Sequence, residues 1–211
     1  DTDVDELLSE FGSQERGNDP VVYLYENFLA NYDPAQRRQL GAYYTPMPVV
    51  ACIINLIDEA LKAFCGLADG IRDDMSWNEW VNASPGRAMP EGVNASAPVV
   101  CAIDPATGTG TFLLEWLRRT ISSRSRDGVR VALHQISAVE LSLASYAVAH
   151  LKVGMEIPPD VRAQTPIPIF LGNALSGRQP NFLEGLEDPL SIEAAAAAGE
   201  VHNRLHTVVI G

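Results

Sequence analysis

Residues 104–111 follow an apolar run and read Asp-Pro-Ala-Thr-Gly-Thr-Gly-Thr. Glycines directly after a strand let the backbone approach a ligand closely, and a helix that begins there offers free amides to an anion. No lysine follows the glycines as in a Walker loop, and Leu113 stands where a dinucleotide-binding loop has its third glycine. An acidic residue at the strand end, Asp104, instead suits a ligand with both an ammonium and a carboxylate. Taken alone, the loop could also be a tight strand-to-helix turn.

Two further places could bind other parts of the same ligand. Glu140 follows a second predicted strand, where an acidic side chain can accept hydrogen bonds from a ribose diol. Gly172 and Asn173 follow a third, and the Asn173 amide could contact an adenine edge. Taken singly, Glu140 could be a solvated loop charge and Asn173 a turn residue. An amino-acid end, a ribose and an adenine are together the three parts of S-adenosylmethionine.

A doubly wound α/β fold is predicted to position these residues. The unbroken apolar run 99–103 is typical of a buried parallel strand. Further strands are predicted at about 132–139, 167–171 and 207–210, and helices at 111–122, 142–152 and 192–201. In such sheets ligands bind at the carboxyl ends of the strands, which is where all three places fall.

Helices and an irregular segment are predicted before the first strand. Apolar residues recur at helical spacing over residues 20–29 and again over 48–64. Residues 66–97 are rich in Gly, Pro, Asn and Ser and are predicted to form an irregular insertion. The predicted organisation is a helical segment and loop at 1–46 followed by a partial α/β domain at 47–211.

The motifs resemble those of one enzyme family. Residues 104–112 resemble the cofactor-binding motif of amino-group DNA methyltransferases, and residues 41–46, Gly-Ala-Tyr-Tyr-Thr-Pro, resemble the additional motif that precedes it in adenine-N6 enzymes. Residues 19–29 and 147–152 are similar to the methyltransferase module of type ISP and type IIG-like restriction-modification enzymes. The resemblance covers about 19–65 and 99–211 and implies a Rossmann-like class I methyltransferase fold, truncated after its fourth strand, with an N-terminal helical extension.

S-adenosylmethionine is the cofactor that the resemblance implies. Asp104 would face its ammonium, Glu140 would take the ribose hydroxyls, Leu141 would pack on the adenine, and Asn173 would meet the adenine amino group. Thr107 and Asn173 depart from the commonest family pattern, which has Cys and Asp there. The implied binding residues are Tyr44, Thr45, Pro46, Asp104, Pro105, Ala106, Thr107, Gly108, Thr109, Gly110, Thr111, Glu140, Leu141, Asn173 and Ala174, of which Thr45 and the amides at 108–111 would hold the methionine carboxylate.

No catalytic residue is expected within the chain. In the family, an Asn-Pro-Pro-Tyr motif follows a strand ending in Val-Val-Ile-Gly, and here that tetrapeptide ends the sequence at Gly211. The resemblance implies that the full-length protein methylates adenine N6 in restriction-modification or phage defence, while this chain alone is inactive and binds the cofactor weakly. The alternatives are a methyltransferase-like scaffold without catalysis, or a methyltransferase for cytosine, RNA or protein.

The composition of the chain limits the kinds of partner that it is expected to bind. The 15 Lys and Arg against 27 Asp and Glu give a net charge of −12, so this chain itself should repel DNA. Double-stranded DNA is therefore expected to bind through regions outside it, with restriction nuclease or helicase domains or subunits as candidate partners. His202 and His206 lack a patterned acidic partner, and no metal site is predicted. No apolar run approaches the roughly 20 residues of a membrane span, and no secretory signal opens the sequence, which predicts a cytoplasmic protein.

Overall fold

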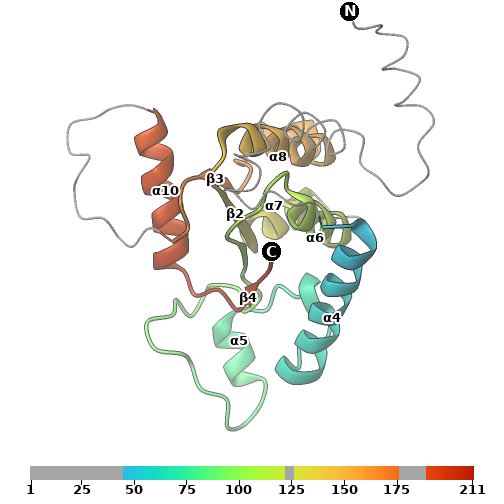
Figure 1. Ribbon diagram of the computed structural model, residues 1–211. Coiled ribbons are helices and arrows are strands. Elements are labelled where there is room, and N and C mark those ends of the chain that lie inside the picture. Colours follow the sequence, from blue (N-terminus) through green and yellow to red (C-terminus); the bar gives the residue numbers. More distant parts are fainter. Residues whose placement is uncertain (1–44, 122–125, 176–188) are drawn as a thin grey trace, which may run out of the picture. The chain divides into compact units, whose positions relative to one another are not determined.

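The computed structural model describes residues 45–121, 126–175 and 189–211 (Figure 1). The chain forms two units, Asp1–Cys52 and Ile53–Gly211. Helix α4 (Met47–Cys65) begins in the first unit, where the Pro46 carbonyl accepts hydrogen bonds from the amides of Val49 at 2.9 Å and Val50 at 3.1 Å. The helix predicted at 20–29 lies outside the described residues.

The second unit is built on a parallel four-stranded sheet with the order β3-β2-β1-β4. Ile103 of β1 pairs with Ser137 of β2, and Val139 of β2 pairs with Phe170 of β3. The strands are β1 (Ala102–Asp104), β2 (Ile136–Glu140), β3 (Ile169–Leu171) and β4 (Val208–Val209). The prediction of a Rossmann-like α/β fold is confirmed.

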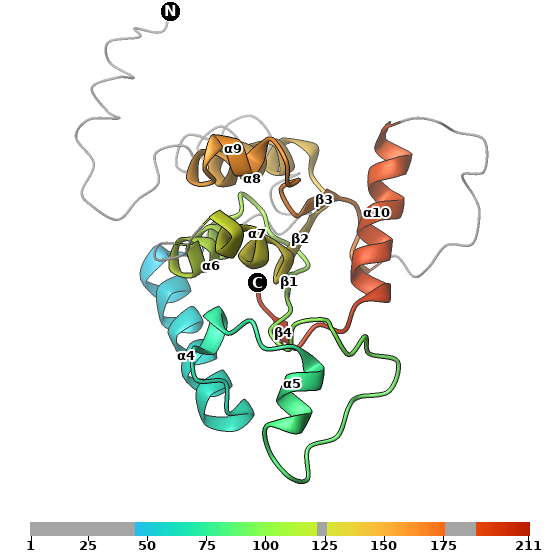
Figure 2. The same ribbon diagram turned by 180° about the vertical axis from the view of Figure 1, so that it is seen from behind.

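Helices cover both faces of this sheet. Figures 1 and 2 show α10 (Pro189–Asn203) on one face and α6 (Thr111–Ile121) and α7 (Arg126–His134) on the other. Helices α8 (Leu143–Glu156) and α9 (Pro159–Arg162) connect β2 to β3. On the α10 face, Ile103, Val139 and Ala197 form a buried apolar cluster. The sheet is thus buried between two helical layers, as parallel sheets require.

All four predicted strands began too early, and the second differs most. The sequence predicted a strand over about 132–139, but helix α7 continues to His134 and β2 begins only at Ile136. Val129, Ala132 and Leu133 are buried at helical spacing, which makes this short helix amphipathic. Its helical period was missed because Gly128 interrupts the pattern and the helix leads into the strand with a single residue between them.

The segment 66–97, predicted to be irregular, contains two short helices, η1 (Gly70–Arg72) and α5 (Trp77–Asn82). Ser76 and Glu79 form a capping box at the start of α5. The Arg87 guanidinium lies 4.4 Å from the Trp80 ring centroid and donates to the carbonyls of Trp80 at 2.9 Å and Cys65 at 3.1 Å. These polar contacts fix the segment against the end of α4.

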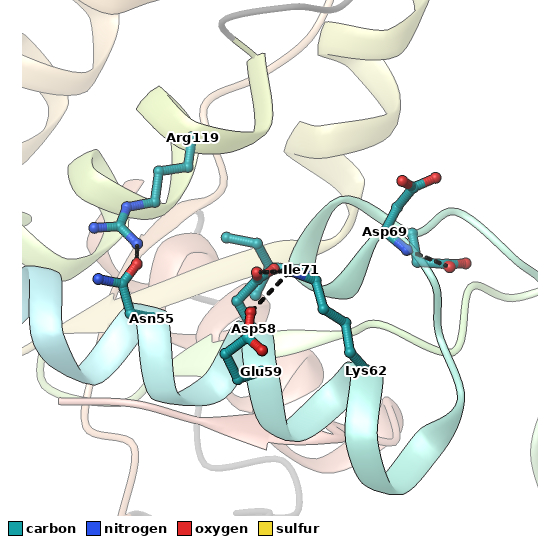
Figure 3. A network of polar contacts seen from close by, with 8 residues as sticks. Asn55, Asp58, Glu59, Lys62, Asp69, Ile71 and Arg119 are labelled. Carbon is teal, nitrogen blue, oxygen red and sulfur yellow. Dashed lines mark hydrogen bonds and ion pairs between the residues drawn. The ribbon is translucent and has the colours of Figure 1, made fainter.

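A carboxylate on α4 holds η1 in place (Figure 3). Asp58 accepts a hydrogen bond from the Ile71 amide at 2.9 Å and pairs with Lys62 at 2.5 Å. Gly70, at φ +57°, leaves room for this contact, because a Cβ there would lie 2.1 Å from an Asp58 carboxylate oxygen. Burial would raise the pKa of Asp58, but the hydrogen bonds from Lys62 and the Ile71 amide outweigh it and hold the pKa below 3.8.

We expect Asp58→Asn to lower the free energy of unfolding by about 1 kcal/mol at neutral pH, because a neutral amide accepts the Ile71 hydrogen bond less strongly. A depressed folded-state pKa gives stability that is present above the unfolded-state value and lost as the pH falls through the folded-state value. The difference from wild type should therefore shrink as the pH drops below about 4. Urea unfolding at several pH values measures it. Glu59→Gln is the control, since Glu59 is 73% exposed and pairs with the same lysine at 3.0 Å. An equal difference at acidic and neutral pH would contradict the assignment.

Candidate functional site

The loop after β1 is folded onto the neighbouring strand. The Thr107 amide donates to the Val139 carbonyl of β2 at 3.0 Å, and the Gly110 amide donates to the Thr107 carbonyl at 2.8 Å. Gly108 and Gly110 have φ values of +56° and +78°, in the left-handed region that favours glycine. The loop is therefore a tight, internally bonded turn that ends where α6 begins.

The two glycines of this loop have different neighbours. A Cβ at Gly110 would lie 3.1 Å from the Ala149 Cβ, so this glycine lets α8 approach the start of α6. A Cβ at Gly108 would meet nothing within 4 Å. Gly110 thus serves packing, whereas Gly108 borders open space beside the first turn of α6, whose leading amides lack partners within the helix.

Glu140, at the end of β2, binds this loop directly. One of its carboxylate oxygens accepts a hydrogen bond from the Gly108 amide at 2.7 Å, and the other accepts one from the Ser142 amide at 2.7 Å. Ser142 is the N-cap residue of α8. One side chain therefore holds both the glycine loop and the start of α8. A carboxylate has about four acceptor positions, so each oxygen can still accept a second hydrogen bond.

Asp104, at the end of β1, receives fewer hydrogen bonds than Glu140. Its side chain is fully buried, and one oxygen accepts a hydrogen bond from the Ala106 amide at 3.2 Å. Within the described residues, the other oxygen, Oδ2, and the Thr107 hydroxyl have no hydrogen-bond partner of normal geometry. Burial raises the pKa of Asp104 to about 7, against the lowering effects of the Ala106 amide and the nearby Thr107 hydroxyl, and the Glu140 charge raises it further.

The third predicted binding position, Gly172 and Asn173, lies beside the second, Glu140. The Gly172 amide donates to the Glu140 carbonyl at 2.8 Å, which brings Asn173 next to the end of β2. The Asn173 side-chain oxygen accepts a hydrogen bond from the Leu175 amide at 2.9 Å, in a local turn. Leu141 is 58% exposed at this edge, whereas Ala174 packs against the buried cluster on the α10 face.

Apart from Ala174, the predicted residues thus fall into three groups. The structure brings the 104–111 loop, Glu140, Leu141 and Asn173 to one edge of the sheet. Thr45, which is half-buried, and Pro46, which is exposed, belong to the first unit, and Tyr44 lies outside the described residues. What sequence reasoning missed is Ser142, whose amide completes the binding of Glu140. The sequence signal that could have found it is a serine at a helix start: the Ser142 hydroxyl accepts a hydrogen bond from the Ser145 amide, as N-cap serines do.

The remaining candidates that the structure describes offer no other site, and the His202 side chain lies outside the described residues. Among the described residues, no group of three or more His, Cys, Asp or Glu side chains could hold a metal ion. Both ring nitrogens of His206 have partners inside the protein, Nδ1 at 3.6 Å from the Cys101 sulfur and Nε2 at 3.0 Å from the Glu200 carbonyl. In the three described stretches, every helix is too short or too polar to cross a membrane.

An all-parallel 3-2-1-4 sheet with a glycine loop after its first strand defines a Rossmann-like α/β fold. No protein-family model and no curated protein matches the chain. It is similar in structure to part of DrdV in a complex with DNA, with a TM-score of 0.60 and 24% identity over 91% of this chain. It is also similar to part of the ATP-dependent type ISP restriction-modification enzyme LlaBIII bound to DNA, with a TM-score of 0.59 and 18% identity over 89% of this chain.

A further similar structure is a nuclease-deletion mutant of the type ISP restriction-modification enzyme LlaGI in complex with a DNA substrate mimic, with a TM-score of 0.52 and 19% identity over 80% of this chain. The chain spans 16% of the length of DrdV and 12% of each type ISP protein. At these sequence identities, the structural similarity establishes the fold alone.

Proposed function

We propose that this chain is the cofactor-binding part of an S-adenosylmethionine-dependent DNA adenine-N6 methyltransferase of a restriction-modification system. The observation that carries the proposal is the buried Oδ2 of Asp104, which lacks a hydrogen-bond donor within the described residues and lies at the end of β1, beside the glycine loop. A buried carboxyl oxygen without a donor is costly, and a ligand ammonium would supply one.

The other residues at this edge fit the remaining parts of the cofactor. Glu140 keeps free acceptor positions that suit ribose hydroxyls. The open space beside Gly108 adjoins the first amides of α6, which suit a carboxylate. The exposed Leu141 side chain offers an apolar surface for an adenine. When bound, S-adenosylmethionine supplies an electrophilic methyl group, and these residues would bind and orient it.

The proposal that DNA is the substrate rests on different observations. The similar structures are parts of DrdV, LlaBIII and LlaGI, each in a complex with DNA or a DNA mimic. The net charge of −12 makes this chain a poor polyphosphate surface, so the DNA would be held by other regions. Adenine in a duplex must be extruded from the stack before its amino group can react. We therefore place base recognition outside this chain.

The decisive experiment incubates the natural full-length protein with duplex DNA and isotopically labelled S-adenosylmethionine. N6-methyladenine should be detected in the DNA by mass spectrometry. Label on the cytosine amino group, on RNA or on protein would identify a different methyltransferase. Cofactor binding without any transfer would favour a non-catalytic scaffold.

For the site itself, we expect Asp104→Ala to weaken binding of S-adenosylmethionine by roughly 1–3 kcal/mol, because a hydrogen bond to a charged group is lost. Calorimetric titration of the full-length protein measures the change. Asp127→Ala is the matched control, since this α7 carboxylate is 91% exposed and pairs with Arg130. Equal affinity of wild type and Asp104→Ala would refute the role of Asp104.

A further inference from the structure

The two carboxyl groups at this edge differ in how well the protein stabilises a negative charge. Glu140 receives two amide hydrogen bonds of 2.7 Å, one on each oxygen. Asp104 is fully buried and receives one of normal geometry, of 3.2 Å, on a single oxygen, with the Thr107 hydroxyl nearby. A buried carboxylate needs several donors to remain charged, so the protein favours a proton on Asp104.

The described ionisable groups around Asp104 do not stabilise a negative charge on its carboxyl. Among the described ionisable groups, the one that acts on the Asp104 carboxyl through its charge is Glu140, which is also negative. The β4 side contributes the apolar residues 208–210 and the Gly211 backbone, which lies against the Asp104 carboxyl. The first turn of α6 carries no charged side chain. Within the part of the chain that the structure describes, no cation therefore faces Asp104 at this edge.

We propose that a ligand ammonium takes the place of a proton on Asp104, so that binding at this site releases that proton. The inference rests on the proposed function and adds a proton-linked step to it. The ammonium brings both a positive charge and a hydrogen-bond donor to Oδ2, and both favour the carboxylate form. The proton leaves to solvent, and the ligand and protein otherwise keep their bonds.

The sign of the pH dependence follows from the raised pKa of Asp104, about 7 in the free protein. Below that pH the free protein carries the proton, and binding must displace it. Affinity should therefore rise with pH by up to about tenfold per unit below neutrality and level off above it. A ligand with the same adenosine but no ammonium should show no such dependence.

The test is calorimetric titration of the natural full-length protein at about pH 6 in two buffers with different ionisation enthalpies. With S-adenosylhomocysteine, the difference between the two binding enthalpies should correspond to release of about one proton. With 5′-methylthioadenosine, which lacks the amino-acid part, it should correspond to none. In Asp104→Asn, S-adenosylhomocysteine should also release none.

The outcomes separate this inference from the proposed function. Binding of S-adenosylhomocysteine to wild type without proton release would overturn the inference alone. Equal proton release with both compounds would also overturn it, because the proton would then come from a group near the adenosine. Failure of both compounds to bind would overturn the proposed function and the inference with it. The comparison of two ligands on one protein does not depend on how any variant folds.

Discussion

Glu140→Ala is expected to weaken cofactor binding by roughly 1–3 kcal/mol and to loosen two segments at once, because two charge-assisted hydrogen bonds disappear. Without the carboxylate, the Gly108 and Ser142 amides lose the partners that they hold at 2.7 Å. Hydrogen exchange should accelerate at both amides, and calorimetry should show the loss of affinity. The exchange measurement requires no cofactor, so it tests the geometry separately from the proposed function.

Two further variants make this result specific. Glu140→Gln keeps one acceptor oxygen, so it should restore slow exchange at one of the two amides and leave the other fast. Glu156→Ala removes a carboxylate from the same region of the chain, at the far end of α8, where it pairs with the exposed Arg118 at 2.7 Å. That surface pair should contribute about 1 kcal/mol at most and should not affect the loop. Unchanged exchange at both amides in Glu140→Ala would refute the contacts.

Gly172→Ala is expected to lower the free energy of unfolding by about 1–3 kcal/mol through overpacking. A Cβ at this position would lie 2.6 Å from the Ala197 Cβ, where β3 leads into the turn beneath α10. Real Cβ atoms do not approach so closely, so the strand end or the helix must shift. Urea unfolding monitored by circular dichroism measures the loss.

The cause can be isolated with a second substitution. Ala197→Gly should cost about 1 kcal/mol alone, as glycine does inside a helix, but should recover stability when combined with Gly172→Ala. Gly199→Ala tests the same helix without a clash, since its nearest contact is the Asn203 side chain at 3.6 Å, and helix propensity predicts a small gain. Strictly additive effects of the Gly172 and Ala197 substitutions would contradict steric overlap between these two positions.

Much of the fold could be predicted because its signals are local. The apolar run 99–103 and the glycines that follow it predicted a buried strand and a turn into a helix. Both are present, although β1 begins only at Ala102 and ends at Asp104. Because all strands are parallel, their carboxyl ends meet at one edge, so the proximity of Asp104, Glu140 and Asn173 followed from the order of elements alone.

The contacts within that edge could not be predicted from local signals. Glu140 was expected to be open to a ligand, yet its two oxygens accept hydrogen bonds from amides 32 residues before it and two residues after it. Such a pairing depends on how closely the loop approaches β2, which the register of the strands decides. The unequal burial of Asp104 and Glu140 could not be predicted for the same reason. In the sequence both are acidic residues at the end of a predicted strand, and only the packing around them distinguishes them.

The hydrogen bonds from Glu140 also determine how a ligand would meet this edge. The glycine loop and the start of α8 are held by the protein's own side chain, so their conformational entropy is lost during folding and not during association. A ligand would then encounter a rigid template, and its association rate should be governed by diffusion and orientation and not by loop closure. Fast association, with no more temperature dependence than the viscosity of water produces, is the kinetic signature of such a template in stopped-flow measurements.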